Sequence, residues 1–341
     1  MSAYQQVQAN LKAAPRRWLV TGAAGFIGSN IVETLLRLDQ QVTGFDNFAT
    51  GKPANLEQIK QAVSPAQWGR FKFIEGDLRK PSDCQTACQG IELVSHQGAL
   101  GSVPRSIADP HTTHEVNVTG TLNLFLAARA QGVRRVVYAS SSSVYGDHPG
   151  LPKVEDQLGQ PLSPYAASKL MNEIYAGVLA QTHGLDAIGL RYFNVFGPRQ
   201  DPEGPYAAVI PKWLAAMLKG ETIYIYGDGE TSRDFCYVAN AVQANILAAV
   251  GANDAAKNQA FNIAVGERAS LNQLFTALQT RLAAVRPGLK ITPPVYQDFR
   301  PGDVRHSLAD ITRARLLLGY EPTHTLDSGL DEALEWYLAN S

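Results

Sequence analysis

The feature that most constrains the fold is a regular alternation of short apolar runs with longer segments of helical periodicity in the first half of the chain. The short runs predict strands and the longer segments predict helices. This alternation is typical of a parallel sheet with helices on both faces, and in such a sheet ligands bind beyond the carboxyl ends of the strands. The predicted strands are Arg17–Thr21, Gln41–Phe45, Phe71–Glu75, Glu92–His96, Arg135–Ala139 and Ala187–Arg191, and the longest predicted helices are Phe26–Leu38, Thr113–Gln131 and Pro164–His183.

After Phe193 this rhythm breaks at a loop rich in proline and glycine, residues 197–206. The elements predicted beyond it are helices at Ala207–Lys219 and Tyr237–Val250, strands at Ile223–Ile225, Ala260–Ile263 and Ile291–Tyr296, and two or three helices near the carboxyl end. We therefore expect an α/β protein with a Rossmann-type, doubly wound parallel sheet and a smaller, interleaved C-terminal α/β lobe. The expected division assigns residues 1–193 and about 235–265 to the sheet domain, and 194–234 and 266–341 to the second lobe.

Composition excludes several classes of function. The formal net charge is −1, so no basic field is available to hold a nucleic-acid backbone or an acidic membrane. The three cysteines form no Cys-x-x-Cys pair, which argues against a disulfide framework or a zinc site. The first fifteen residues contain no apolar core of a signal peptide, and no segment has the pattern of a membrane span. We expect a cytoplasmic protein without a metal ion.

A glycine-rich loop follows the first predicted strand. Gly22, Gly25 and Gly28 have the spacing that allows a tight turn, close approach of the backbone to a pyrophosphate, and packing of the next helix on the strand. The amino end of that helix offers unpaired N–H groups to a diphosphate. Because the chain has 29 glycines, an ordinary strand–turn–helix junction is the alternative interpretation.

An acidic residue ends the second predicted strand. Asp46 lies 18 residues after Gly28, close to the roughly 20-residue offset of a carboxylate that binds the cofactor ribose. A carboxylate there would accept hydrogen bonds from both ribose hydroxyls and repel a 2′-phosphate, which favours NAD over NADP. Asp77, after the third strand, would face the adenine or cap a helix.

A tyrosine and a lysine lie one turn apart at the start of a predicted helix. Ser163 has the position of an N-cap and Pro164 that of the first helical residue, so Tyr165 and Lys169 share a face. An ammonium group beside a phenol favours the phenolate and lowers the pKa expected of Tyr165. With 13 tyrosines present, the spacing alone could arise by chance, and its position after the fifth strand makes it specific.

A run of serines directly follows the strand Arg135–Ala139, at the edge where ligands bind. A hydroxyl at Ser141, Ser142 or Ser143 can contact the reacting oxygen of a substrate and relay its proton to Tyr165. The alternative interpretation is a polar loop without a chemical role.

These features together resemble the UDP-sugar 4-epimerase family of extended short-chain dehydrogenases/reductases. The resemblance covers nearly the whole chain and extends to the Arg-Tyr-Phe-Asn run at 191–194. Segments 99–106, 145–152 and 300–307 are most similar to bacterial UDP-N-acetylglucosamine 4-epimerases of O-antigen synthesis. The resemblance implies that NAD and a UDP-sugar are the ligands, and it implies a homodimer formed through the helices Thr113–Gln131 and Pro164–His183.

The resemblance also implies roles for individual residues. The implied catalytic residues are Tyr165, Lys169, Ser141, Ser142 and Ser143. The implied cofactor-binding residues are Gly22, Gly25, Phe26, Ile27, Gly28, Asp46, Asn47, Gly51, Asp77, Leu78, Gln97, Ala99, Asn117, Tyr165, Lys169 and Phe193. The implied substrate-binding residues are Gly101, Ser102, Ser141, Ser143, Asn194, Ala208, Val209, Tyr224, Arg233, Arg300, Asp303 and Ser307.

Two positions bear on how far the resemblance extends. The family often has Ala-Ala after the fourth strand, where this chain has Gly98-Ala99. At Ser307, the family's UDP-glucose/galactose enzymes that exclude acetamido sugars have a bulky aromatic residue, so a serine leaves room for an N-acetyl group. The implied reaction is C4 epimerisation of UDP-GlcNAc and UDP-GalNAc through a transient 4-keto sugar.

Three alternatives stay open. A UDP-glucose/UDP-galactose 4-epimerase would use the same machinery. An enzyme acting on UDP-hexuronates would need a cation facing the C6 carboxylate, for which Arg105 or Arg305 is available. A non-catalytic NAD-binding protein would be expected to lose the Tyr165/Lys169 pair that this chain retains. A 4,6-dehydratase is disfavoured because Ser142 and Ser143 stand where it needs an acidic pair.

Overall fold

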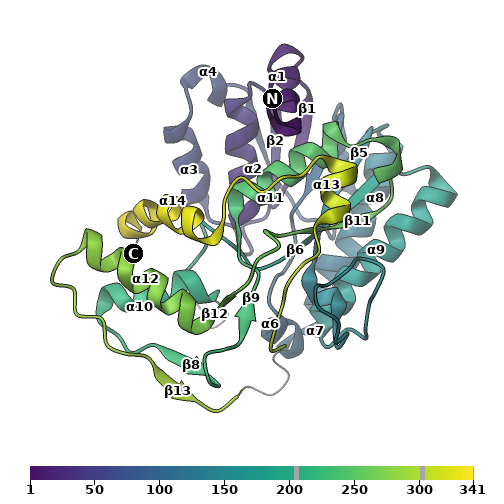
Figure 1. Cartoon of the computed structure of the whole chain (residues 1–341). Helices are drawn as coiled ribbons and strands as arrows, with labels where there is room; N and C mark the ends of the chain where they lie inside the picture. The colour runs from purple at the N-terminus through teal and green to yellow at the C-terminus, as the bar shows by residue number, and fades with distance from the viewer. Residues whose placement is uncertain (203–206, 300–303, 341) are drawn as a thin grey trace.

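The fold is built on one seven-stranded parallel sheet. The computed structural model describes residues 1–202, 207–299 and 304–340. The strand order is β11-β6-β5-β4-β1-β2-β3, and every neighbouring pair is parallel (Figure 1). The strands are β1 (Arg17–Thr21), β2 (Gln41–Asp46), β3 (Phe71–Glu75), β4 (Leu93–His96), β5 (Arg135–Ser141), β6 (Ala187–Tyr192) and β11 (Ala260–Ile263). The predicted Rossmann-type α/β class is confirmed.

Helices cover both faces of this sheet and bury it. One hydrophobic core joins the sheet to α1, α2, α3, α11 and α13, and a second joins its other face to α5, α8 and α9. Strand β6 is buried at every position, which explains why its first four residues carry no polar side chain. The helices concerned are α1 (Ala3–Ala13), α2 (Phe26–Arg37), α3 (Pro53–Ala62), α5 (Pro81–Cys88), α8 (Gly120–Ala130), α9 (Pro164–His183), α11 (Val238–Ile246) and α13 (Thr312–Leu318).

Two parts of this domain differ from the sequence prediction. Helix α1 was not predicted; Ser2 caps it, and its apolar residues Val7 and Leu11 pack into the first core. The helix predicted over Thr113–Gln131 is interrupted. It consists of α7 (Pro110–His114), a π-helical turn at Glu115–Thr119, and α8. The π turn adds a residue to one helical turn and so shifts the faces of α7 and α8 relative to each other.

The second lobe has its own core, which joins α10 (Val209–Lys219), α12 (Leu271–Val285) and α14 (Leu326–Ala339). In Figure 1 these helices lie together to one side of the sheet, above the ribbon of β8 (Tyr224–Tyr226) and β13 (Val295–Gln297). The predicted helix at Tyr237–Val250 is α11 followed by a π turn at Leu247–Gly251. Within the described ranges, no helix is long and apolar enough to span a bilayer.

Short elements complete the described chain. They are α4 (Pro65–Trp68), α6 (Val103–Ala108), a 3-10 turn at Ser142–Tyr145, β7 (Val195–Phe196), β9 (Ser232–Arg233), β10 (Cys236–Tyr237), a 3-10 turn at Asp254–Ala256 and β12 (Ala269–Ser270). The pairing of β11 with β6 returns the chain to the main sheet after it has formed part of the second lobe. The exact division of residues between the domain and the lobe stays a prediction.

Candidate active site

The glycine loop forms a cradle that side chains would fill. Gly22 has φ +66° and donates its N–H to the Phe45 carbonyl at 2.8 Å. A Cβ added to Gly22 would lie 2.8 Å from the Gly98 nitrogen, and one added to Gly28 would lie 2.0 Å from the Gly22 oxygen. Helix α2 begins after Gly25 without a side-chain cap. Its first N–H groups are therefore available to an anion such as a dinucleotide pyrophosphate.

The carboxylate of Asp46 accepts two backbone hydrogen bonds and can accept more. One oxygen accepts from the Ala24 N–H at 2.9 Å and the other from the Phe48 N–H at 2.8 Å. Each carboxylate oxygen has a second lone pair, so both can also accept from ribose hydroxyls. The cradle and this carboxylate fit the adenosine diphosphate part of NAD.

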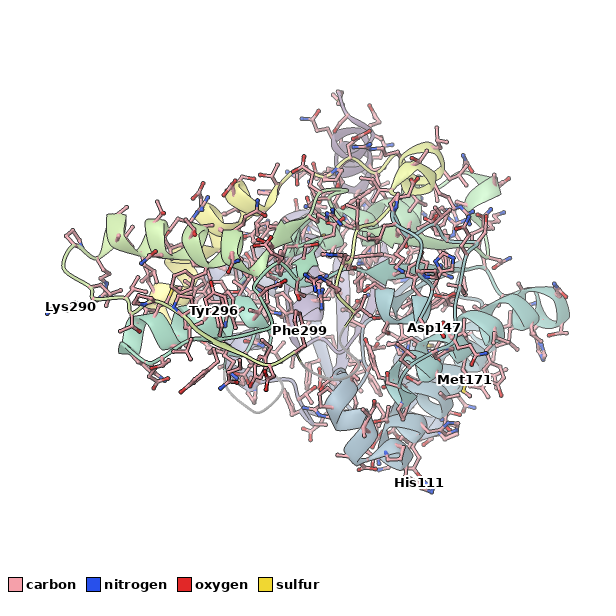
Figure 2. The ribbon with its side chains drawn as sticks, turned by 60° about the horizontal axis from the view of Figure 1, so that its bottom comes forward. His111, Asp147, Met171, Lys290, Tyr296 and Phe299 are labelled. Atoms are coloured by element: carbon pink, nitrogen blue, oxygen red, sulfur yellow. The ribbon has the colours of Figure 1, made fainter. Side chains whose placement is uncertain are left out.

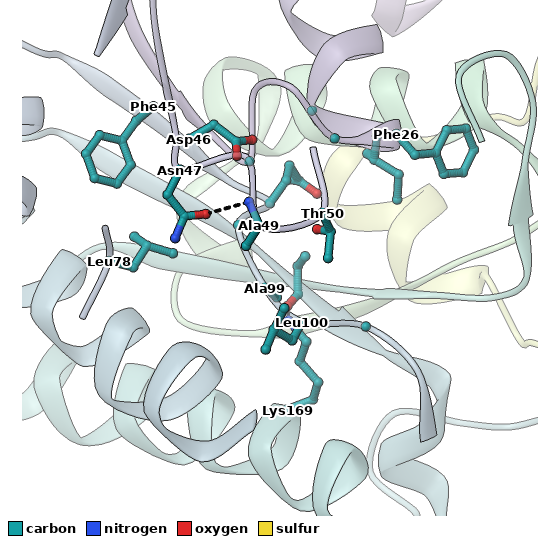
Figure 3. Close-up of a pocket in the computed structure, with 18 of the residues that line it drawn as sticks. Phe26, Phe45, Asp46, Asn47, Ala49, Thr50, Leu78, Ala99, Leu100 and Lys169 are labelled. Atoms are coloured by element: carbon teal, nitrogen blue, oxygen red, sulfur yellow. Dashed lines mark hydrogen bonds between the residues drawn. The ribbon is translucent and has the colours of Figure 1, made fainter. Parts of the chain in front are cut away.

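A cavity of about 300 Å³ opens at the carboxyl ends of the sheet strands, between the glycine loop and the start of α9 (Figure 3). This is the edge of the sheet at which the strand order predicts a ligand. The predicted residues that line it are Gly22, Gly25, Phe26, Ile27, Gly28, Asp46, Asn47, Leu78, Gln97, Ala99, Gly101, Tyr165 and Lys169.

Four predicted cofactor residues lie beside this cavity and do not line it. Gly51 packs under Asp46, where a Cβ would come within 3.0 Å of the carboxylate. The Asp77 carboxylate is engaged by the Arg79 guanidinium at 2.6–3.1 Å. Asn117 and Phe193 are fully buried. The Phe193 side chain belongs to the core and does not line this cavity, and its predicted contact with the cofactor stays a prediction.

The start of α9 presents the catalytic pair. The Ser163 hydroxyl accepts from the Ala166 N–H at 3.1 Å, which confirms the predicted N-cap. The Lys169 ammonium donates to the Ala139 carbonyl at 2.9 Å, at the end of β5, and lies 6.0 Å from the centroid of the Tyr165 ring. The helix thus fixes Tyr165 against the same strand end that carries the serine run.

The serines form a directed relay. The Ser141 oxygen accepts from the Ser143 N–H at 3.1 Å and from the Ser143 hydroxyl at 2.9 Å. Its own hydroxyl proton is then free to point at Tyr165, with which Ser141 forms a hydrogen bond. Protons can pass along hydroxyls arranged in this way. Ser142 lies beside this relay in the 3-10 turn.

The pKa of Tyr165 departs from the expectation. Burial raises it, and the hydrogen bond from Ser141 opposes that rise. Burial also lowers the pKa of Lys169 to about 8. The expected lowering of the Tyr165 pKa is therefore wrong for the chain without its ligands, because burial disfavours the charged phenolate by more than the hydrogen bond from Ser141 favours it.

Several residues of the cavity were not predicted. Tyr192, Gly98 and Leu100 line it, as do Phe45, Ala49, Thr50, Gly76, Ala139 and Ser140. Their position in the sequence could have identified them, because most of these residues lie at the end of a sheet strand or directly after it. Gly98 is required where the loop crosses the glycine cradle, because a Cβ would lie 2.9 Å from Leu78 and 3.2 Å from the Gly22 nitrogen.

The predicted substrate residues gather from separate segments of the second lobe and its junction with the sheet. Asn194 donates to the Asp234 carbonyl at 3.2 Å. Arg233 donates to the Arg305 carbonyl at 3.2 Å, and the Ser307 N–H donates to the Ser232 carbonyl at 3.0 Å. Asn194, Arg233 and Ser307 therefore lie on contacting strands and loops.

The other predicted substrate residues are more scattered. Ala208 and Val209 begin α10, Tyr224 lies on β8, and Ser102 caps α6 next to Gly101 at the cavity edge. Arg300 and Asp303 lie outside the described residues.

Comparison with known proteins decides the family. Residues 18–264 match the NAD dependent epimerase/dehydratase family. The chain belongs to this family. It is an enzyme of the epimerase/dehydratase type, and its cofactor is NAD.

Relatives cover nearly the whole chain. A UDP-glucose 4-epimerase of Mycolicibacterium smegmatis is 37% identical over 94% of this chain and 98% of its own length. Among solved structures, a UDP-N-acetylglucosamine 4-epimerase of Methanobrevibacter ruminantium in complex with UDP-N-acetylmuramic acid is 38% identical, with a TM-score of 0.85 over 96% of this chain and 99% of that one. A Thermus thermophilus UDP-glucose 4-epimerase solved with NAD is 34% identical, with a TM-score of 0.81 over 95% of this chain and 100% of that one. The predicted resemblance is confirmed.

Proposed function

We propose that this enzyme interconverts UDP-GlcNAc and UDP-GalNAc by NAD-dependent epimerisation at C4 of the sugar. The observation that carries the proposal is the directed relay from Ser143 through Ser141 to Tyr165, set beside Lys169 at the edge of the cavity. The relatives named as 4-epimerases of UDP-sugars support this type of reaction.

Tyr165 would take the proton of the C4 hydroxyl, directly or through Ser141, and return it to the C4 oxygen after the sugar has turned and the hydride has returned to the other face of C4. NAD supplies the chemistry of accepting and returning the C4 hydride. Lys169 would favour the phenolate by its charge. Asn194 and Arg233 would anchor the UDP part together with Arg300 and Asp303, while the 4-keto sugar turns about its bond to the diphosphate. Arginine suits diphosphate oxygens because its guanidinium donates two parallel hydrogen bonds.

The preference for an acetamido sugar rests on volume at Ser307. Its backbone is fixed to β9 next to Arg233, and a serine there leaves space that an aromatic residue would fill. The UDP-N-acetylglucosamine 4-epimerase among the similar structures is consistent with this preference.

Three other functions are the alternatives. Relatives include UDP-glucose and UDP-glucuronate 4-epimerases, at 37% and 32% identity. For a hexuronate, the Arg305 guanidinium is already paired with Asp228 at 2.6 Å and stacked 5.3 Å from the Phe299 ring, which disfavours it as the cation for a C6 carboxylate. A non-catalytic NAD-binding protein would not need the relay onto Tyr165.

The test is a panel of substrates. Purified enzyme without added cofactor is incubated with UDP-GlcNAc, UDP-GalNAc, UDP-glucose, UDP-galactose and UDP-glucuronate, and the C4 epimers are separated. We expect kcat/KM to be highest for the two acetamido sugars.

Ser307→Tyr should lower kcat/KM for the two acetamido sugars by roughly 10-fold or more, because a filled pocket rejects the larger substituent, and it should leave kcat/KM for UDP-glucose unchanged. Ser307→Ala is the control for loss of the hydroxyl alone. A higher kcat/KM for UDP-glucose in the unaltered enzyme would contradict the proposal.

We also propose that the enzyme forms a homodimer through α8 and α9. Large apolar side chains on these helices are exposed: Leu126, Met171, Ile174, Tyr175 and Val178. Figure 2 shows Met171 on the same side of the molecule as His111, far from Lys290 of the second lobe. Exposed apolar patches of this kind mark association surfaces.

A further inference from the structure

Loop 97–101 provides five consecutive residues of the cavity wall: Gln97, Gly98, Ala99, Leu100 and Gly101. In Figure 3, Ala99 and Leu100 lie between Thr50 and Lys169. A loop in this position decides how closely the cofactor can lie against the sheet. Its backbone is held from beneath by a buried chain of hydrogen bonds that uses His96, a residue without a role in the proton relay.

The direction of each hydrogen bond in this chain can be assigned. The Thr121 hydroxyl donates to the Asn117 carbonyl at 2.6 Å, so it must accept from the His96 Nε2 at 2.9 Å. The other ring nitrogen, Nδ1, then has no proton and accepts from the Thr21 hydroxyl at 2.6 Å. The Thr21 oxygen in turn accepts from the Gly98 N–H at 3.1 Å. One protonation state of His96, neutral with the proton on Nε2, satisfies every bond.

These hydrogen bonds lead back to the same loop through Asn117. The Asn117 oxygen accepts from the Leu100 N–H at 2.8 Å, and its amide donates to the Leu100 carbonyl at 3.0 Å. The amide also donates to the Ser168 hydroxyl at 3.1 Å, and Ser168 donates to the Tyr165 carbonyl at 2.8 Å. The loop is thus tied at Gly98 and at Leu100, and through Asn117 to the first turn of the catalytic helix.

The groups around the ring favour this state. His96 is 3% exposed, and Thr21, Thr121, Asn117 and Ser168 are buried around it. Burial and the nearby Lys169 ammonium lower the pKa of His96 to about 3. A protonated ring would carry a donor at Nδ1 and break the bond from the Thr21 hydroxyl, so this set of hydrogen bonds requires the neutral form.

We propose that His96 is a positioning residue for NAD: as the neutral Nε2–H tautomer, it sets loop 97–101 at the distance that binds the cofactor. The proposal does not depend on which sugar is the substrate. It predicts that removing the Thr121 hydroxyl weakens NAD binding, although this hydroxyl bonds to His96 and the Asn117 carbonyl and Thr121 is not among the residues that line the cavity.

The experiment measures NAD binding without any UDP-sugar. Cofactor-free protein is titrated with NAD by calorimetry for the wild type, Thr121→Val, Thr121→Ser and Thr34→Val. Thr121→Val removes the hydroxyl but keeps the shape, and should weaken NAD binding by about 10-fold or more, since an acceptor at Nε2–H is lost in a buried site. Thr121→Ser restores the hydroxyl and should bind within about twofold of the wild type.

Thr34→Val is the matched control, because Thr34 makes the same type of helical bond, to the Asn30 carbonyl at 3.0 Å, on α2. It should leave NAD affinity unchanged. Wild-type affinity in Thr121→Val, equal losses in Thr121→Val and Thr121→Ser, or an equal loss in Thr34→Val would overturn the proposal.

A second measurement needs no variant, and it tests the assigned protonation state of His96 even if Thr121→Val does not fold. The ring ¹⁵N resonances of His96 in the wild-type protein should report the neutral Nε2–H form and stay constant between pH 5 and pH 8. A proton on Nδ1, or a ring that titrates in that range, would refute the assignment.

Discussion

At the scale of the residue, Lys169 carries its charge in a place that water barely reaches. It is 4% exposed, and its ammonium donates to the Ala139 carbonyl. Burial lowers its pKa to about 8, from about 10.4 in an unfolded chain. The buried charge therefore destabilises the folded state by up to about 3 kcal/mol, and this destabilisation is fully present below pH 8.

Lys169→Met should accordingly be inactive yet more stable than the wild type. In cofactor-free protein at pH 7, we expect its free energy of unfolding to rise by about 1–3 kcal/mol, reduced by the lost bond to Ala139. The advantage should shrink between pH 8 and pH 10.4, because the wild-type lysine then loses its proton in the folded state first. Urea unfolding at pH 7 and pH 10 measures this. A variant less stable than the wild type at pH 7, or an advantage that grows with pH, would contradict it.

At the scale of the element, α9 holds β5 at three successive turns. Tyr165, Lys169 and Glu173 lie four residues apart on one face. The Glu173 carboxylate accepts from the Ser140 hydroxyl at 2.5 Å and pairs with the buried Arg191 guanidinium at 2.7 and 2.9 Å, and the Glu173 side chain is itself only 11% exposed. The catalytic strand end is thus fixed at adjacent residues by the same helix.

Glu173→Gln should be strongly destabilising, because it leaves the buried Arg191 cation without its counter-charge. We expect a loss of about 3 kcal/mol or more in the free energy of unfolding. The control is Asp331→Asn, which removes an exposed partner of Arg281 and should cost less than about 1 kcal/mol. Chemical denaturation compares the two, and similar losses in both variants would show that the Glu173 pair has no special role.

Elements with a clear period were predictable from the sequence. β1, β3, β11 and α9 have the expected bounds. The large apolar residues of β1 and β11 are buried and α9 begins at its Ser163 cap, whereas β3 is only partly buried. The π turn at Glu115–Thr119 was not predictable, because one extra residue in a turn leaves the apolar spacing on either side almost unchanged. That turn places Asn117 under loop 97–101, so the missed irregularity is part of the site.

The site residues also divide into those that the sequence predicted and those that it did not. Gly22, Asp46 and Tyr165 were found because each follows a strand at a recognisable spacing, and the sheet brings those strand ends to one edge. His96 and Glu173 have no such spacing relative to a ligand. Their roles depend on partners far away in sequence, Thr21 and Arg191, which only the folded chain identifies.

At the scale of the whole molecule, the exposed face of α9 predicts association. Ile174 is 57% exposed, with Met171 and Val178 beside it on the helix. Ile174→Glu should convert the dimer to a monomer, because a charge cannot be buried unpaired in an apolar interface. Leu316→Glu on α13, where the leucine is 74% exposed, is the control and should leave the mass unchanged. Sedimentation velocity decides between them, and a wild-type monomer would contradict the proposed dimer.

The whole molecule also explains why the cofactor should not leave during a cycle. The sheet domain provides the glycine cradle, Arg233 and Ser307 are the proposed contacts of the UDP-sugar, and the proposed epimerisation needs no external oxidant or reductant. A hydrogen removed from C4 should therefore return to the same carbon of the same sugar.

The most direct test follows that hydrogen. UDP-GlcNAc with deuterium at C4 is incubated with the enzyme in ordinary water, and the UDP-GalNAc formed is examined by NMR and mass spectrometry, with Tyr165→Phe as the control that should form little or no product. The account predicts that the deuterium is retained at C4 with inverted configuration. Loss of the deuterium to solvent, or the absence of UDP-GalNAc with the wild-type enzyme, would contradict it.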